Sequence, residues 1–322
     1  MSMSVLQLLG GFVMLTLGAE GLVRGGASLS RRLGVSTIIV GLTVVSYGTS
    51  FPEFLVCTIG AARGQTELAL GNVIGSNICN IGLVLGVAAL IRPIRVARVT
   101  VKRDMPPLIG VTVAVIVMSL VGAGIGRVDG ALLVLGSVFY TAWHVVTARR
   151  QYLRASSLPG FDEKASHEKS VSVNMLFILL GGLALWLGSE GVIRGAVNLS
   201  RILELDMRFV ALTIVALGTS LPELAASCVA SARGEEGISL GNVIGSNVMN
   251  ITFVLGFAAL IRPIPVALDL GTGIDMGVML FVVLVLWPIL KLRYAVSRTG
   301  GLLLVLLYCC YIGYRAWVVF SA

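Results

Sequence analysis

An internal repeat limits what this chain can fold into. The segment from Gly71 to Ile94 matches the segment from Gly241 to Ile264 at 19 of 24 positions, without a gap. The same offset of 170 residues pairs further positions, namely Glu20 with Glu190, Arg24 with Arg194, Gly48-Thr49-Ser50 with Gly218-Thr219-Ser220, and Pro52-Glu53 with Pro222-Glu223. We therefore predict two related halves, residues 1–148 and 173–322, joined by a polar linker at 149–172.

The composition indicates that lipid surrounds both halves. Of the 322 residues, 57% are hydrophobic and 12% are charged, and this charged share is about half that of an ordinary soluble domain. A helix needs about 20 residues to cross a hydrocarbon core. Each half has five apolar segments of about that length, near 5–22, 35–61, 68–91, 105–124 and 130–148, and near 173–190, 209–231, 237–261, 270–290 and 300–320. We predict an all-α integral membrane protein with ten transmembrane helices.

An odd number of spans in each half predicts two five-helix repeats of inverted topology, because the second half then enters the membrane from the opposite side. The loops on one side carry 17 Lys or Arg and those on the other carry 6. The loops rich in basic residues lie at 23–34, 92–104, 149–172, 232–236 and 291–299. The positive-inside rule places these loops in the cytoplasm and both termini outside. The net charge of +8 thus fits a multi-pass protein of the inner (plasma) membrane, without a nucleic-acid partner.

A glutamate lies in the middle of an apolar segment in each half. Glu53 and Glu223 each end the sequence Gly-Thr-Ser-x-Pro-Glu. A charged side chain at membrane depth costs about 2.5 to 3.5 kcal/mol on insertion scales, so a functional role is the default interpretation. A structural glutamate would need a basic partner, and neither motif has one within two helical turns. We predict that Glu53 and Glu223 bind a cation.

Each motif also offers backbone oxygens beside its glutamate. Proline lacks an N–H and crowds the carbonyl four residues earlier, which frees the carbonyls of Gly48 and Gly218. The carbonyls of Thr49 and Thr219 are loosened as well. Broken helices persist at membrane depth only where protein or a polar cavity satisfies their backbone. Hard cations prefer carboxylate, carbonyl and hydroxyl oxygens, and each motif supplies all three.

A second polar motif follows each glutamate and reads Gly-Asn-Val-Ile-Gly-Ser-Asn at 71–77 and at 241–247. Helical spacing puts its first Asn, its Ser and an Asn four residues further along on one face. These residues are Asn72, Ser76 and Asn80 in the first half and Asn242, Ser246 and Asn250 in the second. Such side chains also join neighbouring helices, so for each single residue both interpretations are open. Two motifs from each half would enclose a site of oxygen ligands.

Other charged residues have simpler interpretations. Glu20 and Glu190 each precede an arginine by four residues, which a helix-surface ion pair explains, and a role in gating is the alternative. His144 has no neighbours in the sequence that suggest a metal site. Three aspartates near membrane edges are interpreted as loop or interface residues: Asp104, Asp269 and Asp275.

The doubled pair of motifs, GTSxPE and GNVIGSN, resembles the cation/calcium antiporter superfamily, specifically its short prokaryotic sodium/calcium exchangers. The resemblance covers almost the whole chain and implies a ten-helix inverted repeat whose helices 2, 3, 7 and 8 hold the ions while helices 1 and 6 slide. The implied calcium ligands are the carboxylates of Glu53 and Glu223 and the carbonyls of Thr49 and Thr219. The implied sodium sites involve Ser50, Ser220, Ser76 and Ser246.

Two departures narrow this resemblance. Asn80 and Asn250 are both amides, where some relatives carry an aspartate at one of these positions, so the centre has no third carboxylate. This weakens the case for potassium co-transport. The linker at 149–172 is also too short to contain the calcium-sensing domain of animal exchangers.

The resemblance implies a secondary active antiporter that exchanges Ca2+ for Na+ by alternating access. Such a protein is no enzyme and needs no cofactor, and its partners are the lipid bilayer and the two transported ions. An antiporter that couples Ca2+ or another cation to H+ is the main alternative, because protons also neutralise carboxylates. An intramembrane hydrolase would need a water-activating arrangement that these motifs lack. A channel fits less well, since inverted repeats with broken helices favour alternating access.

Overall fold

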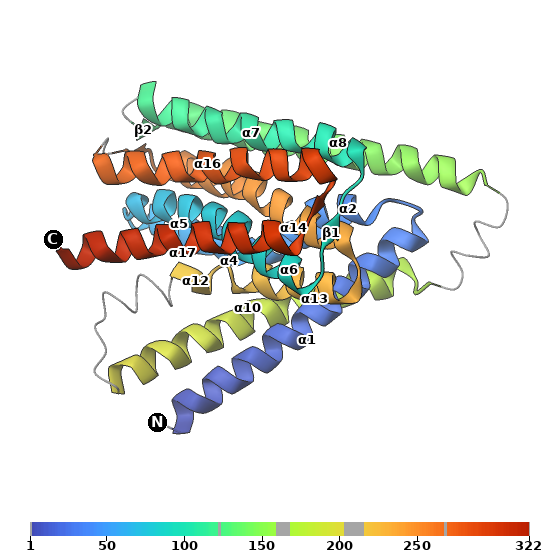
Figure 1. The fold of residues 1–322 in the computed structure, drawn as a ribbon, viewed down its shortest axis with the longest axis horizontal. Coiled ribbons are helices and arrows are strands. Elements are labelled where there is room, and N and C mark those ends of the chain that lie inside the picture. The colour runs from blue at the N-terminus through green and yellow to red at the C-terminus, as the bar shows by residue number, and fades with distance from the viewer. Residues whose placement is uncertain (1, 122–123, 159–167, 203–215, 267–268, 322) are drawn as a thin grey trace.

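The computed structural model describes residues 2–121, 124–158, 168–202, 216–266 and 269–321, which form a bundle of helices (Figure 1). The helices are α1 (Ser2–Arg32), α2 (Thr37–Val40), α3 (Ser46–Thr49), α4 (Phe51–Ala62), α5 (Thr66–Cys79), α6 (Gly86–Ile91), α7 (Arg98–Val121), α8 (Arg127–Ser156), α10 (Val171–Ile202), α12 (Ala216–Gly218), α13 (Leu221–Arg233), α14 (Glu236–Met249), α15 (Leu255–Ile261), α16 (Leu270–Arg293) and α17 (Arg298–Ser321). Within the described residues, π-helical turns interrupt them at η1 (Gly41–Val45), η2 (Asn80–Leu85) and η4 (Asn250–Val254). The strands are β1 (Ile94–Arg95), β2 (Gly124–Ile125), β3 (Ile264–Pro265) and β4 (Ala295–Val296).

Most of the predicted spans are present as membrane-length helices. Among the described residues, eight helical segments are long and apolar enough to cross a membrane, and a ninth span is a pair of helices bent by 46°. The bent span runs from Thr37 to Ala62 and breaks at Ser50, two residues before Pro52. The predicted span at 209–231 begins outside the described residues. The fold is mostly helical, with membrane-length helices as predicted and, among the described residues, four short strands that were not predicted, and the total of ten spans stays a prediction.

Several helices are longer than the apolar segments that predicted them. α1 ends at Arg32 and not near residue 22, and α10 ends at Ile202 and not near residue 190. α8 continues to Ser156, into the predicted linker. The predicted ends were wrong because hydropathy reports the thickness of the hydrocarbon, whereas backbone hydrogen bonds continue a helix into the polar region beyond it.

The two halves meet through reciprocal contacts. β1 pairs with β4, and β2 pairs with β3. Figure 1 shows β1 and β2 near opposite ends of the long helices. A Cβ added at Gly130 of α8 would lie 2.8 Å from the Gly256 carbonyl oxygen, and one added at Gly301 of α17 would lie 2.7 Å from the Gly86 carbonyl oxygen. In both pairs of contacts, shifting the residues of one contact by 170 positions gives the residues of the other, to within one residue.

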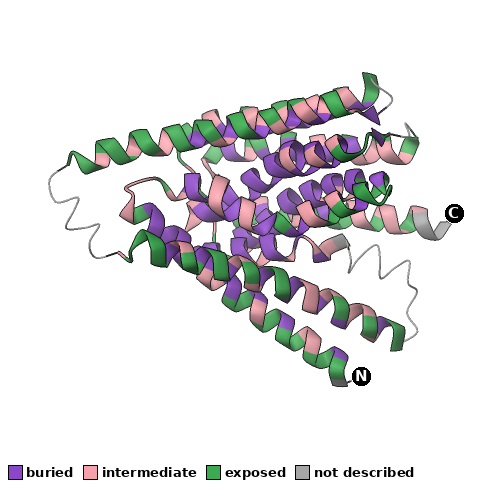
Figure 2. Cartoon of the chain, turned by 180° about the vertical axis from the view of Figure 1, so that it is seen from behind, coloured by how far each residue is buried: buried purple, intermediate pink, exposed green. Residues whose placement is uncertain are grey.

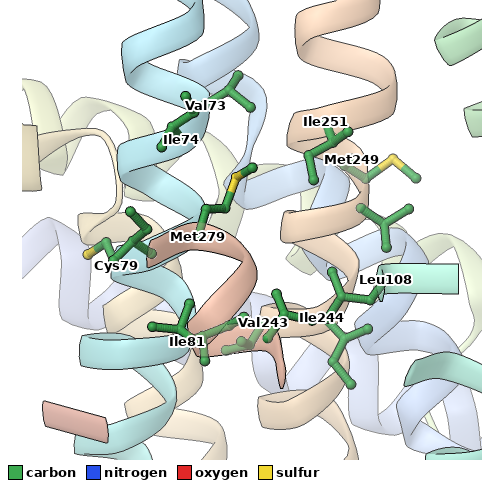
Figure 3. Packing of buried hydrophobic residues seen from close by; sticks show 14 of the residues in the cluster. Val73, Ile74, Cys79, Ile81, Leu108, Val243, Ile244, Met249, Ile251 and Met279 are labelled. Carbon is green, nitrogen blue, oxygen red and sulfur yellow. The ribbon is translucent and has the colours of Figure 1, made fainter. Parts of the chain in front are cut away.

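The helices with the GNVIGSN motifs occupy the centre of the molecule. Every residue of α14 from Ile238 to Met249 is buried. Buried side chains gather on the inner helices, whereas the outer helices carry many exposed residues (Figure 2). Figure 3 shows the packing between these inner helices, where Val73 of α5, Ile244 of α14 and Met279 of α16 belong to one cluster. Exposed apolar side chains around a buried centre are expected when lipid is the solvent.

α1 and α10 form a closely packed pair along one edge of the bundle (Figure 1). Glycines line their contact. A Cβ added at any of four glycines would lie 2.6 or 2.7 Å from a backbone atom of the partner helix, and these are Gly11, Gly18, Gly181 and Gly188. Small residues let helix backbones approach closely in a membrane, so α1 and α10 contact each other through smooth surfaces.

The structure corrects the interpretation of Asp104 as a loop or interface residue. Asp104 lies within α7 and is 0% exposed. Arg103 donates two hydrogen bonds to its carboxylate, at 2.7 and 2.8 Å, and His144 Nε2 of α8 lies 3.9 Å from Asp104 Oδ1. α7 begins at Arg98, six residues before Asp104. Hydropathy alone had placed Asp104 at the membrane edge. Asp275 is hydrogen-bonded by Tyr311, and Asp269 is the N-cap of α16.

The glycine contact between α1 and α10 yields a test with adjacent residues. Replacing Gly11 by Ala puts a methyl group 2.7 Å from the Gly188 carbonyl oxygen, and such overpacking costs about 1–3 kcal/mol. Gly10→Ala is the control, because a Cβ there meets nothing within 4 Å and alanine favours the helix by about 1 kcal/mol. We expect Gly11→Ala to lower the thermal unfolding temperature in detergent and Gly10→Ala to leave it unchanged or raise it. Equal effects of the two variants would contradict the packing described.

Candidate ion-binding site

The two glutamate motifs form matching bends. Ser50 separates α3 from α4 with φ −82° and ψ 6°, and Ser220 precedes α13 with φ −88° and ψ 4°. Both conformations lie in the sparsely populated bridge region, near φ −90° and ψ 0°. Pro52 and Pro222 then stand in the first turn of the next helix, where the missing N–H is tolerated. Each glutamate therefore lies in a first helical turn, where the positive end of the helix dipole favours an anion.

Glu53 and Glu223 are both enclosed by protein, with 1% and 0% of their surface exposed. Ser50 Oγ donates to Glu223 Oε1 at 3.0 Å, so a residue of the first half binds the glutamate of the second. Glu223 Oε2 and both carboxylate oxygens of Glu53 have no hydrogen-bond partner among the described residues. Within the same part of the chain, neither glutamate forms a salt bridge. The centre thus holds carboxylate oxygens with free coordination capacity.

Two hydrogen bonds between threonine and asparagine join the halves beside the glutamates. Thr49 Oγ1 donates to Asn242 Oδ1 at 3.0 Å, and Thr219 Oγ1 donates to Asn72 Oδ1 at 3.3 Å. The 170-residue offset converts one bond into the other. Each threonine hydroxyl donates its hydrogen in this bond, so its oxygen lone pairs stay available to an ion beside the backbone carbonyl oxygen. Asn72 and Asn242, which were predicted only as part of a polar stripe, hold the threonines in place.

The central asparagines connect α5 and α14 directly. Asn77 Nδ2 donates to the Asn247 backbone carbonyl at 3.3 Å, and Asn80 Nδ2 donates to Asn247 Oδ1 at 3.2 Å. A π-helical turn begins at Asn80 and another at Asn250, and such turns are frequent at functional sites. The sequence analysis missed Asn77 and Asn247 because they lie off the predicted stripe. Their presence in both copies of the motif was the signal that could have found them.

The predicted serines divide into two groups. Ser50 and Ser246 contact Glu223, the latter through Oγ at 3.5 Å from Oε1. Ser76 and Ser220 are 2% exposed, and their hydroxyl groups have no hydrogen-bond partner among the described residues. Nine of the ten predicted ligand residues are buried and one is half-buried; the buried ones are Thr49, Ser50, Glu53, Ser76, Asn80, Ser220, Glu223, Ser246 and Asn250, and the other is Thr219.

One of the two carbonyls freed by proline has a partner outside the motifs. Ser189 Oγ of α10 donates to the Gly218 carbonyl oxygen at 2.6 Å. The sequence analysis did not predict this bond, since the 170-residue offset aligns Ser189 with Ala19, which has no hydroxyl group. The Ser189–Gly218 bond therefore connects the bend of the second half to α10, and Ala19 of α1 cannot form the equivalent bond in the first half.

The structure also places Glu20 and Glu190 in different surroundings. Glu20 pairs with Arg24, as predicted, but it also accepts two hydrogen bonds from Arg233 at the end of α13. Among the described residues, Glu190 pairs with Arg194 alone. The helix-surface interpretation is thus incomplete for Glu20, because spacing within one helix cannot reveal a partner 213 residues away.

A second ionic contact lies near the end of α1. Arg31 binds Glu168 at 2.6 Å and Glu235 at 3.0 Å. Burial alone would raise the pKa of the Glu168 carboxyl, but the hydrogen bond from Arg31 lowers this pKa below its usual value. These contacts join α1 to the turn between α13 and α14 at the same end of the helix as Glu20 and Arg233.

A cavity of about 350 Å³ borders the candidate site. Its lining includes Pro52, Trp186, Ser189, Glu190 and Thr219. It also includes Arg63, which is the repeat equivalent of Arg233. The repeat equivalents of Glu20 and Arg233 are therefore Glu190 and Arg63, which both border this cavity. Among the described residues these two do not pair with each other, because Glu190 pairs with Arg194.

The donor set determines what the site can bind. It combines two carboxylates with hydroxyl, amide and carbonyl oxygens, and hard cations such as Ca2+ and Na+ favour oxygen ligands of this kind. A buried carboxylate without a counter-charge costs several kcal/mol. The arrangement therefore suits one or more cations that neutralise Glu53 and Glu223.

Comparisons with known proteins agree with this chemistry. The family model described as sodium/calcium exchanger protein matches residues 3–146 and 173–317. The chain is 35% identical to the putative antiporter CaxA of Alkalimonas amylolytica, over 100% of both chains. It is 27% identical to the sodium/calcium exchanger MaX1 of Methanosarcina acetivorans, over 97% of this chain and 98% of that one.

Solved structures of the sodium-calcium exchanger NCX_Mj have the same fold. One of them, soaked with Na+ and Sr2+, superposes with a TM-score of 0.83 at 30% identity, and covers 97% of this chain and 98% of that one. These relatives are transporters and not enzymes, and Ca2+ and Na+ are transported ions and not cofactors, as the sequence predicted. The chain belongs to the sodium/calcium exchanger family of membrane antiporters.

Proposed function

We propose that this protein exchanges Ca2+ for Na+ across the membrane by alternating access, with both ions bound at Glu53 and Glu223. One observation carries the proposal. Three of the four carboxylate oxygens of these glutamates are buried without a hydrogen-bond partner in the described part of the chain. A permanent structural role would supply donors for them, whereas an ion site must leave them free for its cargo.

The proposed ligands are those that the resemblance to sodium/calcium exchangers implies, and the contacts of Ser50 and Ser246 with Glu223 support them. The carboxylates of Glu53 and Glu223 and the carbonyl oxygens of Thr49 and Thr219 would hold Ca2+. Sodium would use flanking sites that involve hydroxyl groups of both halves, from Ser50, Ser220, Ser76 and Ser246. Asn80 and Asn250 add neutral amides at the centre, so the bound cations balance two negative charges and not three.

This charge balance explains why the two fluxes are coupled. An empty site would carry two negative charges, and enclosing them away from water is costly. A bound Ca2+, or two or more Na+, removes most of that penalty. Only a site with bound ions then changes from facing one side of the membrane to facing the other. Ca2+ therefore moves one way only when Na+ moves the other way.

The membrane arrangement that supports this mechanism has ten spans in two inverted repeats, residues 1–148 and 173–322, with the linker 149–172 in the cytoplasm. Two observations favour it. The contacts between the halves are reciprocal, and Figures 1 and 2 both place the chain termini toward the same end of the bundle. The positive-inside rule assigns this end to the outside of the inner (plasma) membrane. In alternating access, α1 and α10 would slide against the remaining helices, and Glu20 and Glu190 would take turns in closing the two ends.

The first test is Ca2+ uptake by proteoliposomes under an imposed Na+ gradient. We expect Glu53→Gln and Glu223→Gln each to reduce uptake by about tenfold or more, because the number of ligand charges tunes Ca2+ affinity over orders of magnitude. Glu67→Gln is the matched control, since Glu67 lies at the exposed start of α5. Its uptake should equal that of the parent protein.

The same vesicles separate sodium coupling from proton coupling. Uptake in the parent protein should follow the Na+ gradient and should not respond to a pH gradient imposed without Na+. Uptake that follows pH and ignores Na+ would replace the proposal by Ca2+/H+ antiport. Sodium-driven uptake that survives both glutamine variants would disprove the proposed site.

The topology has its own test, which uses introduced cysteines and a thiol reagent that cannot cross membranes. Val128 and Leu292 are 74% and 81% exposed, at opposite predicted faces. In a background with the exposed Cys309 and Cys310 replaced by serine, Val128→Cys should react in intact cells. Leu292→Cys should react only after permeabilisation. The reverse result would invert the assigned orientation, and equal reactivity would overturn the topology.

A further inference from the structure

The bond between Ser189 and Gly218 replaces a missing helical hydrogen bond. Pro222 has no N–H to donate to the Gly218 carbonyl, and the hydroxyl group of Ser189 takes its place at 2.6 Å. Ser189 is 2% exposed, so water does not compete strongly for this contact. The donor belongs to α10, while the acceptor lies one residue before Thr219 of the ion motif.

The position equivalent to Ser189 in the first half offers no hydroxyl donor. Under the repeat, Ser189 corresponds to Ala19, and Gly218 corresponds to Gly48. Ala19 is fully buried in α1 but offers only a methyl group. Pro52 leaves the Gly48 carbonyl without its helical donor, just as Pro222 does for Gly218. The two bends therefore have similar backbone geometry, but α10 offers the second bend a hydroxyl donor where α1 offers the first bend a methyl group.

The position of Ser189 links this difference to access. Ser189 and Thr219 both line the 350 Å³ cavity, together with Glu190 and Arg63. On α1, Glu20 accepts hydrogen bonds from Arg233. The Ser189–Gly218 bond thus belongs to the arrangement in which the cavity is present and the Glu20–Arg233 contact is closed.

We propose that Ser189 is a positioning residue that stabilises this arrangement, and that Ala19 leaves the opposite arrangement without a matching bond. The inference rests on the proposed function, because it assumes that α1 and α10 slide between two arrangements that exchange the roles of the halves. A single hydrogen bond changes an equilibrium by about two- to tenfold. Without bound ions, the protein therefore favours the arrangement with the cavity by about this factor. As a result, the fraction of sites that can bind an ion differs between the two faces of the membrane.

The ratio of the two KM values for Ca2+ measures this inequality. When a carrier has one site and two facing states, the apparent affinity at each face is reduced by the fraction of sites that face it, so the ratio of the two values follows the equilibrium itself. Right-side-out and everted vesicles give the two values. Ser189→Ala should raise the KM at the cavity face relative to the other face by about two- to tenfold.

Two companion variants sharpen the test. Ser189→Thr keeps a hydroxyl group and should keep the ratio near that of the parent protein. Ala19→Ser should shift the ratio in the same direction as Ser189→Ala, because it supplies a donor for the Gly48 carbonyl in the opposite arrangement. Ser200→Ala is the matched control, since Ser200 is buried in the same helix and donates at 2.8 Å to the Ala196 carbonyl of its own helix. It should leave the ratio unchanged.

The outcomes distinguish this inference from the function on which it rests. If Ser189→Ala changes both KM values equally, or changes only stability or kcat, Ser189 is structural and the inference is overturned. Sodium-driven exchange by the parent protein would then still support the proposed function. If the parent protein shows no sodium-driven exchange, the proposed function fails first, before any variant is compared.

Discussion

Two carboxylates lie in the centre of an apolar helix bundle, and no basic residue in the described part of the chain neutralises them. Much of the surrounding structure is consistent with this constraint. The bends at Ser50 and Ser220 place each glutamate at the start of a helix, where the dipole favours its charge. Threonine and asparagine side chains join the halves around the glutamates but leave three carboxylate oxygens unpaired. The outer helices carry many exposed residues (Figure 2), and large apolar side chains are among them.

The central and peripheral helices are built for different tasks. α14 is buried along almost its whole length, and asparagines link it to the end of α5, which favours a fixed geometry at the candidate ion site. α1 and α10 contact each other through glycines, and few polar bonds tie them to the other helices. A rigid centre beside a smooth, lightly attached pair is the arrangement that alternating access requires, because the ligands must stay in place while the entrance changes sides.

Much of this could be predicted from the sequence, because the features that mattered were local and duplicated. Proline in the motif predicts the break at Ser50, and the repeat predicts that Glu53 and Glu223 play the same part. Contacts between distant segments could not be predicted. Arg233 reaches Glu20 across 213 residues, and the burial of Asp104 depends on where α8 packs against α7. Helix ends were also missed, because apolar patterning reports the membrane and not the hydrogen-bonded helix.

The bonds between the halves constrain how the two copies of the repeat can change over time. Thr49 is held by Asn242, Thr219 by Asn72, and Glu223 by Ser50. A substitution in one copy therefore leaves an unpaired polar group in the other, so the copies cannot drift apart at these positions one residue at a time. The loops face no such constraint, and there the copies did diverge: the segment 92–104 has five basic residues where its counterpart has one. The loops were thus free to diverge in charge, while mutual dependence at the centre kept the motifs of the two copies the same.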